Sequence, residues 1–364
     1  MDRRFVVPLA FVLALLSAFL APPAGACTRV VYLGANDDVI TARSMDWKND
    51  VATNLWIFPR GMARSGQAGP NSVTWTSKYG SVIATGYDIS TTDGMNEAGL
   101  MANVLWLVES EYPAYDGRGP GLSIAAWAQY ALDNYGSVKE AVDALRKQPF
   151  TVVTDKVPGE DRLTTLHLSL SDASGDSAII EYIGGKQVIH HGREFQVMTN
   201  SPVFDQQLAL NAYWKGIGGL TFLPGTNRAA DRFARASFLI DAIPTKVDPS
   251  YISAVPEKKF EYQAAASVLS VMRSVSVPLG ITTPGEPNIS STLWRTISDQ
   301  TNKIYFFDSS TSPNSFWVPL ADLDLKQGAP VKKLTIAGGK VYSGNAADKF
   351  VATPAFTFLP STGL

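Results

Sequence analysis

Cys27 is the only cysteine in a chain of 364 residues, and the segment before it has the features of a secretory signal. Arg3 and Arg4 form a positive start, an apolar run covers Phe5 to Ala21, and Ala24-Gly25-Ala26 presents small residues to a signal peptidase. The apolar run is at the short limit for a membrane span, which disfavours an uncleaved anchor. We therefore expect residues 1–26 to be removed, so that Cys27 becomes the first residue of the mature protein.

A thiol at a new N-terminus has two main chemical explanations. It can carry a lipid, or it can be a nucleophile whose base is its own α-amine, since an α-amine has a pKa near ~7.7–8.0 and can accept the thiol proton. Ala24 matches a lipoprotein signal only in part, and the segment Thr28 to Leu33 resembles a β-strand rather than a flexible tether. The sequence favours the nucleophile, with a lipid anchor and a passive buried cysteine as alternatives.

Composition excludes several other classes of protein. The 31 Lys and Arg residues against 33 Asp and Glu leave no positive surplus for binding a phosphate backbone, so we expect no nucleic-acid partner. One cysteine rules out a disulfide framework and a cysteine-built zinc site within the chain, and three histidines leave little for other metal centres. Hydrophobic residues make up 45% of the chain, which is enough for a large folded core.

The elements around Cys27 predict a β-hairpin that gathers reactive groups. Strands are expected over residues 27–33 and 39–43, with a turn centred near Asn36. This register would set the thiol opposite Arg43 and Ser44, where a guanidinium would stabilise a thiolate. The residues that the hairpin would bring together are Cys27, Arg43, Ser44, Asp46 and Trp47. An ordinary surface ion pair between Arg43 and Asp46 is the alternative.

Short motifs follow this hairpin in a consistent order. They are Cys27-Thr28-Arg29, Thr41 to Trp47, Asp93 to Leu100, Asp172 to Gly175 with Ala178 to Tyr182, Met198 to Pro202, Leu223 to Gly225 with Asp231 to Phe233, and Trp294-Arg295 with Asp299 to Phe306. Together they resemble the choloylglycine hydrolase and penicillin V acylase family, whose members are N-terminal-nucleophile hydrolases of linear amides. The short segment between Asn200 and Arg232 resembles the Gram-negative branch of that family.

The resemblance implies a role for each site residue. Cys27 would be the nucleophile, Arg43 would lie beside the thiolate, and Asp46 would hold the α-ammonium group. Asn200 would donate a side-chain N–H to the oxyanion, with the backbone N–H of Trp106 as the second donor. Arg232 matches the arginine of a Ser-Arg-Phe motif, although Asp231 replaces the serine here and could pair with Arg232 or Arg235.

Two tryptophans suggest the shape of the substrate. Trp106 stands where bile-salt-type relatives are expected to carry Asn and other penicillin acylases Tyr, and with Trp47 it would form a flat apolar acyl pocket. Ordinary core packing of both indoles is the alternative. We expect an amidohydrolase of small-molecule aryloxyacetyl or fatty acyl amides, including N-acyl homoserine lactones. Conjugated bile salt hydrolysis is the alternative within the class, and a lipid-anchored periplasmic binding protein is the alternative outside it.

Strand blocks alternate with helix pairs along the chain, which favours antiparallel sheets covered by helices. Strands are expected over residues 27–47, 73–85, 91–107, 164–171, 176–182, 291–298 and 303–308, and helices over residues 122–134, 137–147, 203–214, 228–243 and 262–275. The family resemblance implies an α+β fold, a four-layer αββα sandwich formed by residues 27–364 as one domain. It also implies a homotetramer without metal or cofactor, and a periplasmic location without membrane insertion after signal cleavage.

Overall fold

The computed structural model describes residues 26–282 and 290–361. Apart from Ala26, the predicted signal peptide lies outside these residues. No helix in the described ranges combines the length and the apolar composition needed to cross a membrane.

The first large sheet carries Cys27. Its strand order is β14-β1-β2-β15-β16-β17-β19, antiparallel except for the last pair. The strands are β1 (Cys27–Leu33), β2 (Val39–Trp47), β14 (Val197–Met198), β15 (Ser291–Asp299), β16 (Ile304–Ser309), β17 (Ser315–Pro319) and β19 (Gly344–Asn345). The predicted hairpin is present, but Cys27 pairs with Met45, and Arg43 pairs with Arg29. The predicted centre at Asn36 is correct, and the partners assigned to Cys27 were one to two positions too early.

The second large sheet is antiparallel throughout, with the order β13-β12-β11-β8-β7-β6-β3-β18-β20. Its strands are β3 (Leu55–Phe58), β6 (Ser81–Gly86), β7 (Ser90–Asn96), β8 (Met101–Trp106), β11 (Leu166–Ser171), β12 (Ser177–Ile183), β13 (Lys186–His191), β18 (Lys332–Leu334) and β20 (Val351–Ala352). Two small ribbons lie outside the large sheets. They pair β4 (Ala63–Ser65) with β5 (Thr74–Thr76), and β9 (Gly121–Ser123) with β10 (Thr151–Val153).

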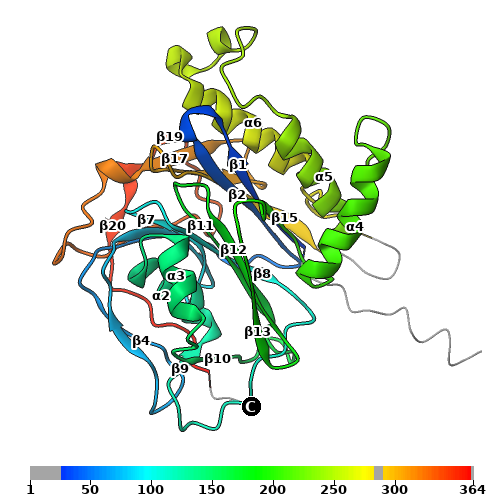
Figure 1. The fold of residues 1–364 in the computed structure, drawn as a ribbon. Helices are drawn as coiled ribbons and strands as arrows, with labels where there is room; N and C mark the ends of the chain where they lie inside the picture. Colours follow the sequence, from blue (N-terminus) through cyan, green and yellow to red (C-terminus); the bar gives the residue numbers. More distant parts are fainter. Residues whose placement is uncertain (1–25, 283–289, 362–364) are drawn as a thin grey trace, which may run out of the picture.

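Helices cover the outer faces of both sheets (Figure 1). On the side of the first sheet are α4 (Phe204–Ile217), α5 (Ala229–Ala242) and α6 (Phe260–Ser274), and on the side of the second are α2 (Trp127–Asn134) and α3 (Val138–Leu145). One apolar core fills the space between the sheets and reaches α5 and α6, and a second core lies between the second sheet and α2 and α3. The four-layer αββα prediction is confirmed.

Helix boundaries follow local capping. Ser137 caps α3, because its Oγ accepts a hydrogen bond from the Glu140 N–H, while the Glu140 carboxylate accepts one from the Gly136 N–H. The predicted helix at residues 122–134 was wrong in its first part. Leu122 lies in β9 and pairs with Val152, so that α2 begins only at Trp127.

Candidate active site

The thiol of Cys27 is enclosed at the first position of β1, where the residue is only 3% exposed. Its Sγ lies 3.9 Å from Nη2 of Arg43 and 3.9 Å from the backbone oxygen of Asp46. Burial raises the pKa of Cys27, and the positive charge of Arg43 opposes that rise. Burial thus disfavours the thiolate, and a nearby base would help the sulfur to attack a substrate.

Arg43 crosses the space between the two sheets. Its Nη2 donates to Met45 Sδ and to the backbone oxygen of Val104, both at 3.1 Å, and its guanidinium lies 4.7 Å from the ring centroid of Trp294. Within the described part of the chain, its Nε and Nη1 have no hydrogen-bond partner. The surface ion pair with Asp46 does not form, since both side chains are buried and the guanidinium faces the sulfur instead.

Arg232 ties the start of β1 to α5. Its Nη1 donates to the Cys27 backbone oxygen at 2.6 Å and to Thr28 Oγ1 at 2.5 Å, and its Nη2 donates to Asn200 Oδ1 at 2.7 Å. Asp231 does not draw Arg232 away from these partners, because its carboxylate accepts a hydrogen bond from the Thr226 hydroxyl instead. The structure thus brings Arg232, which the sequence motif singled out, to the cysteine.

The side-chain amide of Asn200 connects three parts of the site. Its Oδ1 accepts from the Cys27 backbone N–H at 2.6 Å, and its Nδ2 donates to the Trp106 backbone oxygen at 2.7 Å. Gln207 of α4 donates to the backbone oxygen of Asn200 at 3.0 Å and so fixes the loop from the other side. One N–H of the Asn200 amide is engaged by Trp106, and the second remains available to another acceptor.

The carboxylate of Asp46 is half satisfied. Oδ1 accepts a hydrogen bond from Thr292 Oγ1 at 2.6 Å, whereas Oδ2 is buried without a hydrogen-bond partner among the described residues. Arg232 Nη1 lies 4.0 Å from Oδ2. Burial raises the pKa of Asp46, and the charge of Arg232 lowers it. A buried carboxylate oxygen without a hydrogen-bond partner, such as Asp46 Oδ2, can accept a hydrogen bond from a cationic group placed beside it.

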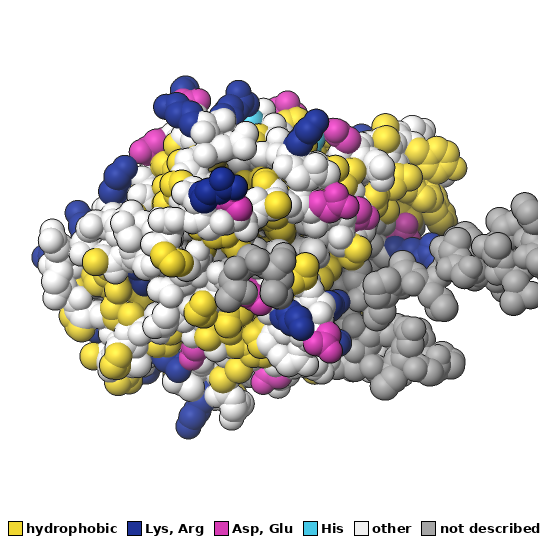
Figure 2. Space-filling model, turned by 90° about the horizontal axis from the view of Figure 1, so that it is seen from below, with side chains coloured by type: hydrophobic (Ala, Val, Ile, Leu, Met, Phe, Trp, Pro, Cys, Tyr) yellow, Lys and Arg dark blue, Asp and Glu magenta, His cyan; other side chains and the backbone are white. Residues whose placement is uncertain are grey.

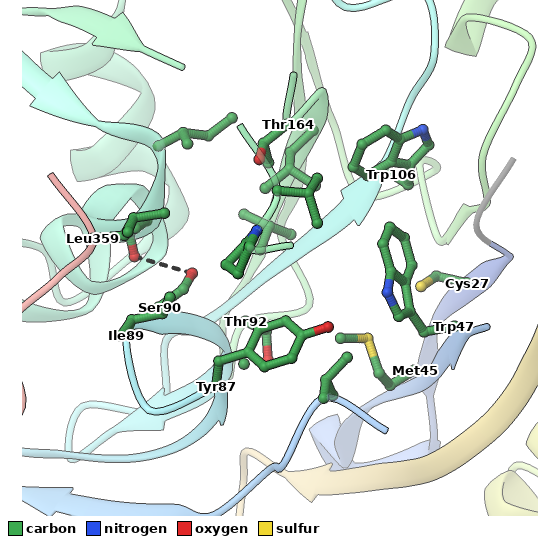
Figure 3. A pocket seen from close by; sticks show the side chains of 18 of the residues that line it. Cys27, Met45, Trp47, Tyr87, Ile89, Ser90, Thr92, Trp106, Thr164 and Leu359 are labelled. Carbon is green, nitrogen blue, oxygen red and sulfur yellow. Dashed lines mark hydrogen bonds between the residues drawn. The ribbon is translucent and has the colours of Figure 1, made fainter. Parts of the chain in front are cut away.

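A cavity of about 120 Å³ opens beside the thiol. The rings of Trp47 and Trp106 form one wall, with centroids 5.3 Å apart and planes inclined at 54°. Figure 3 shows Cys27 at one end and Ile89 and Leu359 at the opposite end. The remaining lining is mainly apolar: Arg43, Met45, Val51, Gly86, Tyr87, Ser90, Thr92, Val104, Ile124, Ala125, Val157, Pro158, Thr164 and Leu166. Both indoles therefore line a cavity next to the thiol as well as packing in the core.

One residue of the site has no counterpart in the sequence analysis. The guanidinium of Arg162 lies 4.9 Å from the ring centroid of Trp47 and 4.5 Å from that of Trp106. It forms an ion pair of 2.7 Å with Glu160, which also pairs with Lys48 at 3.1 Å. Arg162 belongs to an irregular loop between β10 and β11 with no sequence motif, so only its position over the indoles shows its connection to the cavity.

The residues in ranges 26–282 and 290–361 contain no cluster of three or more His, Cys, Asp or Glu side chains that could hold a metal ion. The charged groups nearest the sulfur are two arginines and one aspartate. This arrangement can stabilise a thiolate, orient an N-terminal amine and stabilise an oxyanion, which are the requirements of acyl transfer through a thioester.

Comparison with known proteins gives consistent results. Residues 27–333 match the model of the linear amide C–N hydrolases, choloylglycine hydrolase family. The chain is 55% identical over 349 residues to a penicillin V acylase of Pectobacterium atrosepticum, covering 92% of each chain. It is 63% identical to the solved penicillin V acylase of Agrobacterium tumefaciens, with a TM-score of 0.83 and coverage of 92% of this chain and 99% of that one.

A more distant group of relatives acts on bile salts. A bile salt hydrolase/transferase of Clostridium perfringens is 29% identical over 229 residues, which is 55% of this chain and 68% of that protein. A solved mutant of the conjugated bile acid hydrolase from the same organism has a TM-score of 0.70 at 21% identity and covers 88% of this chain and 98% of that one. At 21% identity, the structural similarity is evidence for a shared fold alone.

Proposed function

The chain belongs to the choloylglycine hydrolase family of linear amide C–N hydrolases, and within that family we propose a penicillin V acylase-type enzyme whose nucleophile is Cys27. It is an amidohydrolase, and the proposal concerns its substrate and its reacting residues. One observation carries the proposal. The sulfur lies beside Arg43 at one end of an apolar cavity walled by two indoles.

Removal of residues 1–26 would convert the Cys27 backbone N–H into a primary amine. In the present structure this nitrogen donates to Asn200 Oδ1 at 2.6 Å. Once charged, the amine would also provide the donor that the open oxygen of Asp46 lacks. The proposed mature enzyme is a single domain, residues 27–364.

The proposed reaction proceeds in two acyl transfers. The α-amine accepts the Cys27 thiol proton, and the sulfur attacks the amide carbonyl while Arg43 stabilises the thiolate charge. The free N–H of the Asn200 amide and the Trp106 backbone N–H stabilise the oxyanion, with Arg232 and Gln207 holding Asn200 in place. The amine product leaves with the proton, and water then attacks the thioester and releases the acid and the thiol.

Cavity size supports an aromatic acyl group. A dry apolar cavity of ~150 Å³ accepts benzene, so a cavity of about 120 Å³ beside two indoles is close to the size of one ring. The phenoxyacetyl group of penicillin V carries one such ring. A bile acid presents four fused rings and exceeds this space, which places bile salt hydrolysis second. N-acyl homoserine lactones are a further proposed substrate class, because the cavity favours any apolar acyl group.

The lipid-anchor alternative is disfavoured by the position of the thiol. A residue 3% exposed at the first position of a sheet strand does not present its sulfur to a bilayer. A secretory signal without lipidation leads us to propose a periplasmic location.

A homotetramer is the proposed assembly, and an apolar surface on α4 and the segment after it supports it. Leu210, Tyr213, Leu220 and Phe222 are between 44% and 96% exposed there. Figure 2 shows apolar side chains gathered at the end of the molecule that carries α4 in Figure 1. A surface of this kind is typical of subunit contacts. Light scattering of the purified enzyme tests the assembly, and a monomer would overturn it.

The proposal is tested on purified secreted protein with phenoxyacetyl, cholyl-glycine and acyl homoserine lactone amides, together with intact mass. We expect the mass of residues 27–364 without a lipid, and the highest kcat/KM on the phenoxyacetyl amide. A diacylglycerol on Cys27, or a preference for the bile salt, would overturn it. A protein that retains Ala26 and is fully active would refute the role of the α-amine.

A further inference from the structure

The segment Asp93 to Leu100 is one of the motifs of the chain, but the proposed reaction gives it no part. Its first residue, Asp93, lies on β7 and is fully buried. Oδ1 of this carboxylate accepts a hydrogen bond from the Tyr305 hydroxyl, and Oδ2 accepts one from Asn103 Nδ2 at 2.5 Å and one from Thr296 Oγ1 at 3.2 Å. Because Tyr305 and Thr296 belong to the first sheet and Asp93 to the second, the carboxylate lies between the two sheets.

The guanidinium of Arg43 shares neighbours with Asp93 on both sheets. Thr296, which donates to Asp93, is the partner of Arg43 across β2 and β15, and directly paired residues of antiparallel strands project to the same face. On β8, Arg43 donates to the Val104 oxygen. The residue before Val104 is Asn103, which also donates to Asp93. The carboxylate and the guanidinium therefore lie close together.

The two arginines of the site differ in their counter-charges. Arg232 has Asp46 beside it, with Nη1 4.0 Å from Oδ2. By contrast, Nη2 of Arg43 contacts two sulfur atoms and a backbone oxygen, and within the described residues its Nε and Nη1 have no hydrogen-bond partner. A buried guanidinium without a counter-charge is costly. The carboxylate of Asp93 is in a position to balance it.

Hydrogen bonds and a neighbouring cation favour the ionised form of Asp93. Burial raises the pKa of Asp93, and the positive charge of Arg43 is the largest of the influences that lower it. Burial and the negative charge of Asp93 raise the pKa of Tyr305 well above its usual value, so the phenol keeps the proton that it donates. Three donors directed at one carboxylate stabilise its charged form.

We propose that Asp93 is the counter-charge of Arg43 and a positioning residue of the active site, whose negative charge limits how strongly Arg43 binds the Cys27 thiolate. The inference rests on the proposed function, since it assumes that Cys27 reacts as a thiolate. An uncompensated cation would make the sulfur a weaker nucleophile, because nucleophilicity falls with the pKa of a thiol, with a Brønsted coefficient of about 0.4–0.5. Asp93 does not line the acyl cavity, so it acts on the reaction through Arg43.

The test measures the rate at which iodoacetamide alkylates the mature enzyme from about pH 5 to about pH 10. Cys27 is the only cysteine of the chain, so the profile reports a single thiol. Asp93→Asn removes the negative charge and keeps the size of the side chain. Asp46 of β2, Arg232 of α5 and the α-amine also act on the sulfur, and they are unchanged in this variant.

The loss of the Asp93 charge should favour the thiolate. We expect the alkylation midpoint of Asp93→Asn to lie about one pH unit below that of the unmodified enzyme. Above the midpoint, the alkylation rate and kcat/KM for the phenoxyacetyl amide should both be about threefold lower, because the thiolate is a weaker nucleophile. A purely structural role of Asp93 would lower the melting temperature without moving the midpoint.

Asp133→Asn is the matched control. Asp133 of α2 is as buried as Asp93 but lies on the outer side of the second sheet. Its carboxylate accepts hydrogen bonds from Gln129 and Trp75 at 2.8 Å each and lies 3.4 Å from Nε of Arg64. This variant should lower the melting temperature and leave the alkylation midpoint unchanged.

Tyr305→Phe separates the charge of Asp93 from its hydrogen bonds, and it gives a result even where Asp93→Asn does not fold. It removes one donor, while Asn103 and Thr296 still donate to the carboxylate. Because no charge near Arg43 is lost, the alkylation midpoint should stay within about 0.3 pH units of that of the unmodified enzyme.

Three results would overturn the inference. They are an Asp93→Asn midpoint at or above that of the unmodified enzyme, an Asp133→Asn midpoint lowered as far as that of Asp93→Asn, and a Tyr305→Phe midpoint lowered by about one pH unit. If alkylation of Cys27 leaves the activity intact, the proposed function fails instead. The alkylation midpoints would still decide whether Asp93 acts on the sulfur, which separates the two hypotheses.

Discussion

The two ends of the acyl cavity are built in opposite ways. At the thiol end, Cys27, Arg43, Asp46, Asn200 and Arg232 are each 3% exposed or less and come mostly from sheet strands and a helix. At the far end, Ile89, Pro158 and Leu359 lie in turns and irregular segments and are half-buried or exposed. The groups around the sulfur thus belong mostly to strands and a helix, whereas those at the far end belong to turns and loops, which in general move more readily.

The two ends also differ in how they are held. At the thiol end, buried charges are fixed by hydrogen bonds that cross from α5 to β1 and from β8 to the loop after β14. At the far end, the contact between Ile89 and Leu359 rests on one backbone hydrogen bond and apolar packing. Removing one member of a buried ionic network leaves other polar groups unsatisfied, whereas trimming an apolar wall leaves only space. Substitutions at the thiol end should therefore cost far more than those at the far end.

The largest expected effect is that of Cys27→Ala. Without the sulfur no thioester can form, so kcat should fall by about 10⁴-fold or more on every substrate, while the melting temperature changes little. Cys27→Ser should be far weaker than the unmodified enzyme because its hydroxyl is a poorer nucleophile at neutral pH. Activity of Cys27→Ala within about tenfold of the unmodified enzyme would move the chemistry away from the thiol end.

Arg232→Met tests how much the thiol end contributes to the stability of the fold. It removes the donors to the Cys27 oxygen, Thr28 Oγ1 and Asn200 Oδ1 and leaves Asp46 without its nearest cation. The free energy of unfolding should fall by about 3–5 kcal/mol, as measured by urea denaturation.

Arg228→Met, an exposed residue at the start of the same helix, serves as the control and should change stability by no more than about 0.5 kcal/mol. Leu359→Ala at the far end should cost about 1 kcal/mol. Equal losses for Arg232→Met and Leu359→Ala would contradict the contrast between the ends.

Glu181 should make the stability of the protein depend on pH in the acid range. This buried carboxylate of β12 accepts hydrogen bonds from the Phe204 N–H at the start of α4 and from His167. Burial alone would raise its pKa, but hydrogen bonds from His167 and His190 lower the pKa of Glu181 to about 2. The helix that it anchors carries Gln207, which holds the Asn200 loop.

Because its folded pKa lies below its unfolded value, ionised Glu181 stabilises the fold above about pH 4.5, and this contribution is lost as the pH falls toward 2. The expected contribution is about 3 kcal/mol. The stability difference between the unmodified protein and Glu181→Gln, measured by urea denaturation, should therefore shrink from about pH 6 to about pH 3. A difference that is constant across this range would mean that Glu181 has no such role.

The sequence predicted the thiol end better than the far end, for a physical reason. Cys27, Arg43 and Asp46 lie within one hairpin, so local strand pairing alone brings them close together. The predicted partners of Cys27 were one to two positions too early although the centre was correct, because a register symmetric about the turn at Asn36 pairs residue 27 with residue 45. Asn36 and Asp37 adopt positive φ angles of 58° and 59° in that turn. Asn200 and Arg232 came from family motifs, since no local pattern relates them to β1.

The far end had no signal that could be detected along the chain. Ile89 and Leu359 are separated by 270 positions and meet only after β6, β7 and the C-terminal segment have packed. The strands β18 to β20 have only two or three residues each, which is too few to show a periodicity in the sequence. Arg162 likewise acts through cation–π contacts that depend on tertiary packing.

Trp106 lies between the two ends, and its truncation has the most selective expected effect. Its backbone oxygen accepts a hydrogen bond from Asn200, while its ring packs on Trp47 and under Arg162. Trp106→Ala keeps the backbone contact and removes ring contact of ~100 Å², or ~2–3 kcal/mol at ~25 cal/mol per Å².

For an aromatic or long-chain acyl amide, this corresponds to a loss of about 30- to 150-fold in kcat/KM. An acetyl amide does not reach the ring, so its low rate should change little. Both rates are measured together, with the melting temperature as a check on folding. Equal losses on both substrates would mean that the Trp106 ring only packs in the core, and the preference for aromatic or long-chain acyl groups would lose its basis. A loss confined to the large acyl group would place the boundary between the two ends at the Trp106 ring itself.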